Sequence, residues 1–447
     1  MTGAAHPTEE AKKNGVTDWL RQAGIPLQVD TGQNADDLEP LKKILNGVRV
    51  VGLGEVTHGT KEFFRIRQRL LQFMVSEMGF NTFIVEGSYS AAENVNDYVL
   101  SGAGDRSAVL TGLGSVMWDV EEFSDVLLWL RTHNDSVADA QKVRFYGADI
   151  FHTRVGRERI LAYLKRVNHE KVAVTQTIFE EIAAAEARGL LVAHQHLGRG
   201  LIAQLNSLWD CLLAKRGSLV DRTFVSEYEA ILRHLKVISQ WVRANSSDDL
   251  SPQNSGATGL NIYARSQYMA ENVIRILEEG GRRAKAIIWA HNLHISVDFE
   301  DPDRGPVDNM GHTLRKHFAD KYYSFGLELN YGTYLARQWL VPGKTLGDLT
   351  VGTIARARPA TLPWQLSQAD VRNFMLNLRI PPQPLGIEQW LLTPQIMHCM
   401  GWAYSDPPLE TEVILKKHFD GMIFIDSTSA TTPTANAIKT VAHRAGH

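Results

Sequence analysis

The 447-residue sequence is poor in cysteine, and it has neither a marked excess of one charge nor a long hydrophobic run. Its two cysteines, Cys211 and Cys399, cannot build a disulfide framework or a four-cysteine zinc site, which favours a reducing compartment. The 47 Lys and Arg against 50 Asp and Glu leave a net charge of -3, whereas a dedicated nucleic-acid binder carries a basic domain or stripe. We therefore expect a protein that does not have nucleic acid as its partner.

The hydrophobic segments are too short for a membrane role. No stretch approaches the roughly 18 apolar residues that a membrane-spanning helix needs. Residues 1–15 contain acidic side chains and lack the apolar centre of a secretory signal, and we expect them to be disordered. Together with the cysteine content, this predicts a cytoplasmic protein with no membrane partner. No sequence pattern indicates an oligomeric state.

Six short apolar runs, each bounded by turn residues, are rich in β-branched and aromatic residues and lack clean alternation. This composition is typical of strands that are covered on both faces. The runs span 48–54, 81–87, 143–149, 284–292, 322–330 and 420–426. Helical patterns lie between them, at 60–78, 121–134, 153–167 and 312–319. Strands that alternate with helices predict an α/β fold with a three-layer α/β/α core and a mainly parallel sheet.

The patterning also predicts how the chain is divided. Long helical runs at 171–188, 222–245 and 259–279, without a convincing strand, indicate a helical insertion over the predicted cleft. The expected parts, in chain order, are an N-terminal extension (1–45), the first part of the α/β core (46–153), the helical insertion (154–280), the second part of the core (281–330), an irregular excursion (331–410) and the final helix and strand of the core with a tail (411–447).

Titratable residues follow every predicted strand. In an open parallel sheet, ligands bind beyond the carboxyl ends of the strands. The residues found there are, in chain order, Glu55 and His58, Glu86, Asp149, His291 and His294, Glu328, and Asp426. Each one alone has an ordinary explanation, because turns are polar and Asp often caps a helix. Six such strand ends on one edge predict a cleft that holds several carboxylates and imidazoles.

Glu55 and His58 form the most informative pair, because they lie in a tight loop between two glycines, just before a helix. A histidine held by a carboxylate has a fixed tautomer and a raised basicity, as a general base for water requires. The structural alternative is a loop histidine bonded to backbone.

Arginine spacing on the next helix supports that site. Arg67 falls on the buried stripe of this helix together with apolar residues, namely Phe63, Leu70 and Met74. An arginine on a core stripe is rarely unpaired, so Arg67 should reach a carboxylate such as Glu55 or Glu86, or a developing oxyanion. Arg65 and Arg69 lie on the polar face and should be solvated.

Further along the chain, Arg265 occupies the inner stripe of the 259–279 helix and should point into the cleft, with a structural salt bridge as the alternative. We expect His294, Asp149 and Trp118 to contact the substrate.

A metal site is a weaker interpretation of the same residues. The H-x-x-H spacing of His291 and His294 could supply two ligands for a divalent metal, completed by Glu55, His58 and Glu86. However, the sequence has no HExxH helix and no cysteine pair, so we expect no resident metal or cofactor. His194, His196 and His398 are interpreted as surface residues.

Nucleophile motifs are equally scarce. There is no G-x-S-x-G elbow and no phosphate-binding P-loop, and neither cysteine lies near the histidine loops. A hydrolytic reaction would therefore use water activated by histidine rather than a serine nucleophile.

Several segments resemble the erythromycin esterase family, and the similarity runs from about residue 45 to 435. They are GLGEVTHGTKEFFRIRQRLL, GFNTFIVEG, VMWDVEEFSDVLLWLRTHN, VRFYGAD, RSQYMAENV, IIWAHNLHI and GMIFIDSTSATTPT. The resemblance implies a three-layer α/β/α core and hydrolysis of a macrolide lactone, with His58 as the base and Glu55 beside it. The other active-site residues that it implies are Arg67, Glu86, Arg265, His291 and His294. The sequence departs from the family at Ser266, where an acidic residue is expected, and over residues 331–410. Both differences bear on the identity of the substrate more than on the catalytic machinery.

Three hypotheses follow. The first is a hydrolase of a macrolide or similar polyketide lactone, in which His58 activates water and His291 stabilises or protonates the intermediate. The second is an acid/base lyase, dehydratase or cyclase on the same small-molecule class, and the third is a metal- or cofactor-binding protein. The two enzyme hypotheses require the imidazoles of His58 and His291 to meet.

Overall fold

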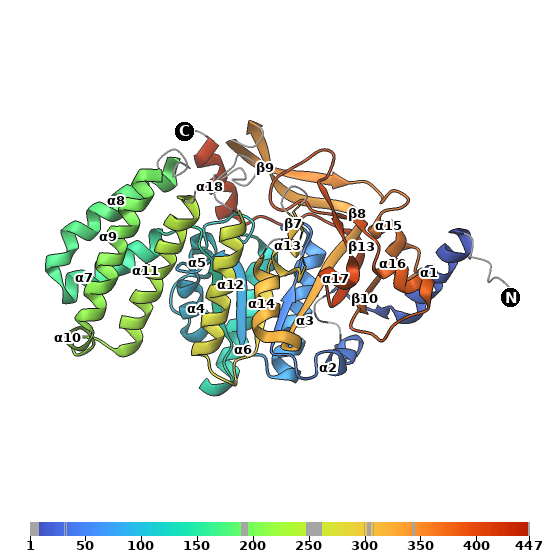
Figure 1. The fold of residues 1–447 in the computed structure, drawn as a ribbon, viewed down its shortest axis with the longest axis horizontal. Helices are drawn as coiled ribbons and strands as arrows, with labels where there is room; N and C mark the ends of the chain where they lie inside the picture. The colour runs from blue at the N-terminus through green and yellow to red at the C-terminus, as the bar shows by residue number, and fades with distance from the viewer. Residues whose placement is uncertain are drawn as a thin grey trace.

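In the computed structural model, the six predicted strands form the parallel part of one nine-stranded sheet (Figure 1). They are β2 (Val50–Leu53), β3 (Thr82–Ser88), β4 (Arg144–Asp149), β5 (Ala286–Trp289), β8 (Tyr322–Val341) and β13 (Gly421–Thr428). Their order is β13-β8-β2-β5-β3-β4, and every neighbouring pair is parallel. The structure describes residues 9–30, 32, 34–188, 195–246, 262–298, 300–301, 305–306, 308–341 and 345–445.

Helices cover the two faces of this sheet. The chain passes outward from β2 through β3 to β4 and then returns to β5 and β8, so right-handed crossovers place the outward and returning helices on opposite faces. The outward helices α3 (Lys61–Met78) and α6 (Glu121–Ser136) contact each other, as do the returning helices α12 (Ile262–Glu279) and α14 (Met310–Phe318), which lie toward the viewer in Figure 1. The predicted α/β fold with a mainly parallel sheet is confirmed.

Between β4 and β5 the described chain is helical up to the start of β5. The helices are α7 (Arg154–Val167), α8 (Val172–Arg188), α9 (Gln195–Ala214), α10 (Arg216–Val220), α11 (Val225–Asn245) and then α12. Helices α7–α11 lie together beyond the β4 edge of the sheet (Figure 1). The sequence patterns predict α8, α11 and α12 and miss α9. His194 and the side chain of His196 lie outside the described residues.

The N-terminal segment and a segment before the last strand add to the sheet in ways that the sequence did not predict. Helix α1 begins at Glu9, so the expected disorder is wrong for 9–15, and residues 1–8 lie outside the described part. Strand β1 (Ile25–Pro26) pairs with β10 (Asn373–Asn377), which pairs in turn with β13. Segments 1–45 and 331–410 therefore each supply a strand to the central sheet. Such short antiparallel strands carry no periodicity that a sequence reading could detect.

The remaining elements complete the layers. Strand β8 extends beyond the predicted 322–330 to form a hairpin with β9 (Thr345–Ile354). The others are α2 (Pro40–Ile44), α4 (Ala92–Ser101), α5 (Arg106–Gly112), α13 (Asn292–Ile295), β6 (Glu300–Asp301), β7 (Gly305–Pro306), α15 (Leu362–Ser367), α16 (Leu385–Leu391), β11 (Gln395–His398), β12 (Glu410–Val413), α17 (Leu415–His418) and α18 (Ala435–Ala445). No helix in the described ranges is long and apolar enough to cross a membrane.

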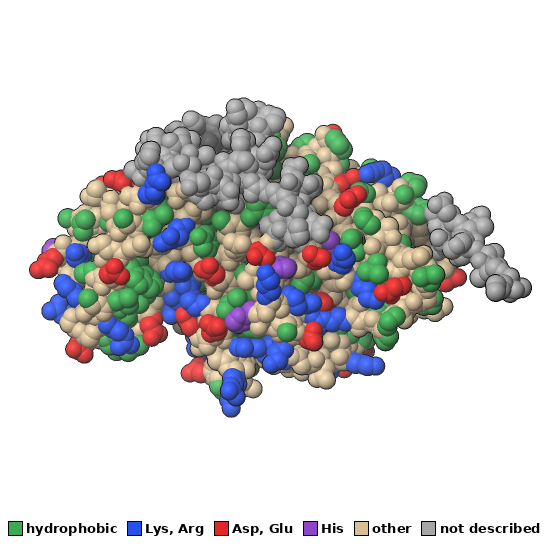
Figure 2. All heavy atoms as spheres, viewed as in Figure 1, with side chains coloured by type: hydrophobic (Ala, Val, Ile, Leu, Met, Phe, Trp, Pro, Cys, Tyr) green, Lys and Arg blue, Asp and Glu red, His purple; other side chains and the backbone are tan. Residues whose placement is uncertain are grey.

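The surface has the mixed charge that the composition predicts. On the face shown in Figure 2, basic and acidic side chains are interspersed rather than gathered into a basic stripe.

Helix α3 has the predicted buried stripe, with one error on its polar face. Phe63, Arg67, Leu70 and Met74 are all buried, as their spacing predicts. Arg65 is half-buried, with 40% of its side chain exposed, but Arg69 is buried because the 28–37 segment crosses this part of the helix. The Arg69 guanidinium is 2.7 Å from Asp37 and also donates to backbone carbonyls of that segment.

A close contact through Asn292 joins the carboxyl ends of β2 and β5 to the neighbouring strand β8. The Asn292 side chain donates to Leu327 O (2.8 Å) and accepts from Leu327 N (3.1 Å), and its backbone N donates to Glu55 O (2.9 Å). Gly54 makes this possible, because a Cβ at this position would lie 1.9 Å from Asn292 Oδ1. The carboxyl ends of β2 and β5 are thereby held against β8 at Leu327.

We expect Gly54→Ala to destabilise the protein by about 1–3 kcal/mol, because the added methyl group must push Asn292 away. Gly112→Ala is the matched control, since a Cβ there meets no atom of the described chain within 4 Å. Urea unfolding of both variants measures the effect. Equal stability of the two variants would contradict the proposed close contact.

Candidate active site

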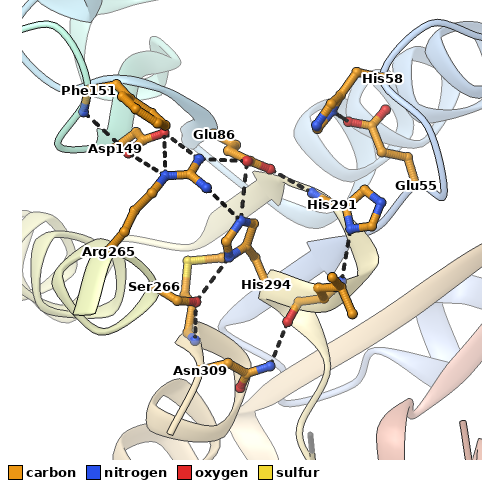
Figure 3. Close-up of polar contacts among 12 residues, drawn as sticks. Glu55, His58, Glu86, Asp149, Phe151, Arg265, Ser266, His291, His294 and Asn309 are labelled. Atoms are coloured by element: carbon orange, nitrogen blue, oxygen red, sulfur yellow. Dashed lines mark hydrogen bonds and ion pairs between the residues drawn. The ribbon is translucent and has the colours of Figure 1, made fainter. Parts of the chain in front are cut away.

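A buried chain of charges holds His58 beside the carboxyl end of β2. His58 Nδ1 lies 2.7 Å from Glu55 Oε1, and the other Glu55 oxygen lies 2.6 Å from Arg67 Nη2 (Figure 3 shows His58 and Glu55). The Glu55 and Arg67 side chains are 1% and 0% exposed, whereas His58 is 13% exposed. The Arg67 guanidinium also stacks 4.7 Å from the Trp289 ring. The predicted contact of Arg67 with Glu55 is confirmed.

The charges in this chain set the protonation of His58. Burial alone would raise the pKa of Glu55, but Arg67 and His58 outweigh it and hold that pKa below its usual value. Burial would likewise lower the pKa of His58, yet the Glu55 carboxylate outweighs it and raises that pKa. A carboxylate can only accept, so Nδ1 carries the hydrogen. The other nitrogen, Nε2, has no hydrogen-bond partner among the described residues.

A second charged cluster surrounds Arg265, which points inward from α12 as predicted (Figure 3). Its Nε lies 3.0 Å from Asp149 Oδ1, and its Nη2 lies 2.6 Å from Asp149 Oδ2 and 2.7 Å from Glu86 Oε1. His294 Nε2 is 3.1 Å from Arg265 Nη1 and 3.2 Å from Glu86 Oε1. Although burial favours a protonated carboxyl, His294 and Arg265 hold the pKa of Glu86 well below its usual value.

Ser266, the departure from the family pattern, fixes the other side of the His294 ring. Its Oγ accepts from Met310 N and lies 3.0 Å from His294 Nδ1. This serine therefore joins α12 to the start of α14 and orients the imidazole at the same time.

His291 lies between the two clusters. Its ring centroid is 5.6 Å from that of His58, and its backbone N donates to Glu86 Oε2 at 2.8 Å. The predicted meeting of the two imidazoles is confirmed. His291 Nε2 must donate to Val56 O (3.2 Å), since a carbonyl only accepts, while Nδ1 accepts from Leu293 N (3.3 Å). Burial and the nearby His58 lower the pKa of His291 to about 4, so the ring is neutral and has no spare N–H.

Two of the three residues predicted to contact the substrate, Trp118 and Asp149, instead contact other residues of the site. The Trp118 side chain packs on Phe123 with ring centroids 4.8 Å apart, and its indole N–H donates to Glu86 O at 3.0 Å. Asp149 is 2% exposed and is occupied by Arg265. Neither side chain presents a free polar atom to a substrate in this geometry, so a direct contact has no support for either residue. His294, with a side chain 12% exposed, is the third and stays a candidate for substrate contact.

The last two strand ends do not join this site. Asp426 accepts from Asn330 (2.8 Å), and the fully buried Glu328 lies 2.8 Å from His398 Nδ1. The prediction that His398 is a surface residue is wrong, since it is 7% exposed. The Glu328–His398 pair joins residues 70 apart in the chain, so no local pattern could have revealed it.

The donor arrangement does not fit a divalent metal. Within the described ranges, no group of three or more His, Cys, Asp or Glu side chains is placed to hold an ion. Glu55 and Glu86 are each paired with an arginine, and His291 Nδ1 accepts from a backbone amide. These oxygens and nitrogens are committed to other partners.

The fold and the site together define an α/β protein with an acid–base cluster at the carboxyl edge of its parallel strands. The sequence model of a family described as Erythromycin esterase matches residues 75–428. The chain belongs to the erythromycin esterase family, and this membership supports hydrolase activity.

Individual proteins are similar to this chain in sequence or in fold. Erythromycin esterase type II from Escherichia coli is 27% identical over 332 residues, covering 69% of this chain and 76% of that protein. A solved Bacillus cereus protein, 23% identical, has a TM-score of 0.79 and covers 96% of this chain and 100% of its own. An erythromycin esterase mutant solved in its open conformation, 19% identical, has a TM-score of 0.66 and covers 92% and 96%. At these identities the two solved structures establish the fold alone.

We expect Arg67→Met to destabilise the protein by about 3–5 kcal/mol, because it leaves the buried Glu55 carboxylate without its cation. Arg65→Met on the same helix is the control, and it should cost less than about 1 kcal/mol because that side chain is 40% exposed. Chemical denaturation measures both. A similar loss in the two variants would refute the idea that Glu55 depends on Arg67.

Proposed function

We propose that this protein hydrolyses the lactone or ester of a macrolide or similar polyketide, using water activated by His58. One observation carries the proposal: His58 has Nδ1 on Glu55 and Nε2 without a partner among the described residues, in a side chain that is 13% exposed. A general base for water requires this arrangement. The family membership and the Escherichia coli esterase relative support the substrate class.

His58 performs the proton transfers in this mechanism. Its Nε2 removes a proton from water as the oxygen attacks the carbonyl carbon, and the Glu55 carboxylate stabilises the resulting imidazolium. Arg67 keeps Glu55 ionised and therefore positions the base without touching the substrate. When the tetrahedral intermediate collapses, the C–O bond of the ester breaks and His58 returns the proton to the leaving alkoxide. The product is a carboxylic acid with a free hydroxyl group.

The second cluster places the Arg265 guanidinium on the other side of His291. The Arg265 and His294 side chains are 11% and 12% exposed, and Glu86 and Asp149 hold them in place. We assign the stabilisation of the developing oxyanion to Arg265, and we assign to His294, whose ring nitrogens contact Arg265, Glu86 and Ser266, the orientation of that guanidinium. Removing one preorganised donor of this kind typically costs about 3–4 kcal/mol in the transition state. His291 acts as a neutral positioning residue, because both ring nitrogens are already hydrogen bonded.

A serine nucleophile is not part of this proposal, although one serine does contact a histidine. Ser90 Oγ lies 3.0 Å from His234 Nδ1, and His234 Nε2 lies 3.0 Å from Glu93. Ser90 and His234 are 1% and 0% exposed, so a bulky ester cannot reach them. These buried hydrogen bonds join the region of α4 to α11.

We expect His58→Gln to lower kcat by about a hundredfold or more, since it removes the general base. The exposed His169 provides the control, and His169→Gln should keep full activity. Incubation with a panel of macrolides and other lactones, followed by mass spectrometry, gives both the rate and the product. Hydrolysis adds the mass of one water molecule to the substrate. A product without this added mass would indicate lyase or cyclase chemistry and refute the proposal.

The pH dependence of kcat/KM tests the role of Glu55. His58 is active only when neutral, and its pKa is raised, so activity should increase with pH through a pKa above about 6.5. Glu55→Gln removes the charge that stabilises the imidazolium, so the pKa should fall and the acidic limb should move to lower pH. An unmoved limb in that variant would show that Glu55 does not act on the base.

A further inference from the structure

A second buried Glu–His pair lies behind the loop of the proposed base. In β8, fully buried Glu328 accepts from His398 Nδ1 (2.8 Å) and from His398 N (2.9 Å), so both donors of one residue bind one carboxylate. A third donor, Leu329 N, contacts the same carboxylate at 2.7 Å. His398 therefore has a fixed ring orientation and a fixed backbone position.

Met400 and Gly401, which follow His398 closely in the chain, are bonded to the loop that carries His58. Met400 N and Gly401 N both donate to Val56 O, at 2.7 and 3.2 Å. In return, His58 N donates to Gly401 O at 3.1 Å, and Thr57 forms a parallel bridge with Gly401. The backbone on both sides of Thr57 is thus held by the 398–401 segment.

The same carbonyl brings His291 into this arrangement. Val56 O accepts from His291 Nε2 (3.2 Å) in addition to the two backbone amides of the 398–401 segment. Because these three donors share one carbonyl, the His58 loop, the His291 ring and the 398–401 segment are held close to one another. A shift of any one of them therefore displaces the other two.

We propose that His398, held by Glu328, is a positioning residue for His58: it fixes the 398–401 segment, which keeps His58 Nδ1 on Glu55. The inference deepens the proposed function, on which its prediction for turnover rests. Its structural part does not need a substrate and can be tested on the free protein.

His234 provides a matched control. Like His398 it is a buried histidine on a carboxylate, 0% exposed and 3.0 Å from Glu93, but its contacts lie between α4 and α11 rather than on the His58 loop. Replacing either histidine removes a buried hydrogen bond and should cost stability. Only the His398 replacement should change the surroundings of His58.

The primary experiment is an NMR titration of the His58 ring in the wild type, His398→Gln and His234→Gln, with the signal assigned by its loss in His58→Gln. We expect the pKa of His58 to fall by about one unit in His398→Gln, because a looser loop weakens the contact with Glu55. Loss of positive charge from His398 would by itself raise the pKa of His58, so the sign separates the two effects. His234→Gln should leave this pKa unchanged.

Turnover gives a second measurement. In His398→Gln, kcat should fall by about tenfold to a hundredfold with KM nearly unchanged, since the base is misplaced and the binding groups are not. If that variant does not fold, Glu328→Gln keeps the side-chain shape and one acceptor and should show the same changes. An unchanged pKa of His58 in the folded variant, with kcat equal to that of His234→Gln, would overturn the inference. If the wild type hydrolyses no ester, the proposed function fails, while the titration still decides the positioning role.

Discussion

The buried ion pair between Arg67 and Glu55 is the interaction on which the proposed chemistry depends. Moving two charges out of water costs several kcal/mol each, and only a close partner offsets that cost. Arg67 provides that partner at 2.6 Å and stacks on Trp289. Glu55 therefore stays ionised in the core, and an ionised Glu55 fixes the tautomer of His58 and raises its basicity.

The parallel sheet explains why two separate charge clusters meet. The strands β2, β3, β4 and β5 are neighbours and point the same way, so the residues after them gather at one edge. Each cluster pairs carboxylates with one arginine, which limits the uncompensated charge that the fold must bury. His291 stands between them as a neutral ring, and its backbone and side chain contact both sides.

The sequence predicted the parts of this site that follow from local periodicity. A 3.6-residue stripe placed Arg67 and Arg265 inward, and strand ends located the carboxylates and imidazoles that face them. The stripe was wrong for Arg69, which it placed on a solvated face, and the separate expectation that His398 is a surface residue was wrong as well. Both are buried because a segment distant in the chain packs over them. The residue pattern of a single helix or strand cannot predict which distant segment covers it.

The amino-acid sequence by itself determined the six parallel strands, most of the longer helices between them and the set of ionisable residues beyond their ends, because these depend on patterns within about twenty residues. Only the tertiary structure decided which groups are partners. The role of a histidine depends on contacts made across the fold. His58 has an unpartnered nitrogen among the described residues, His291 is a neutral ring with both nitrogens hydrogen bonded, and His398 is buried on a carboxylate. Those contacts determine how far each imidazole is removed from water and which charges surround it, and these two factors determine whether the ring is protonated.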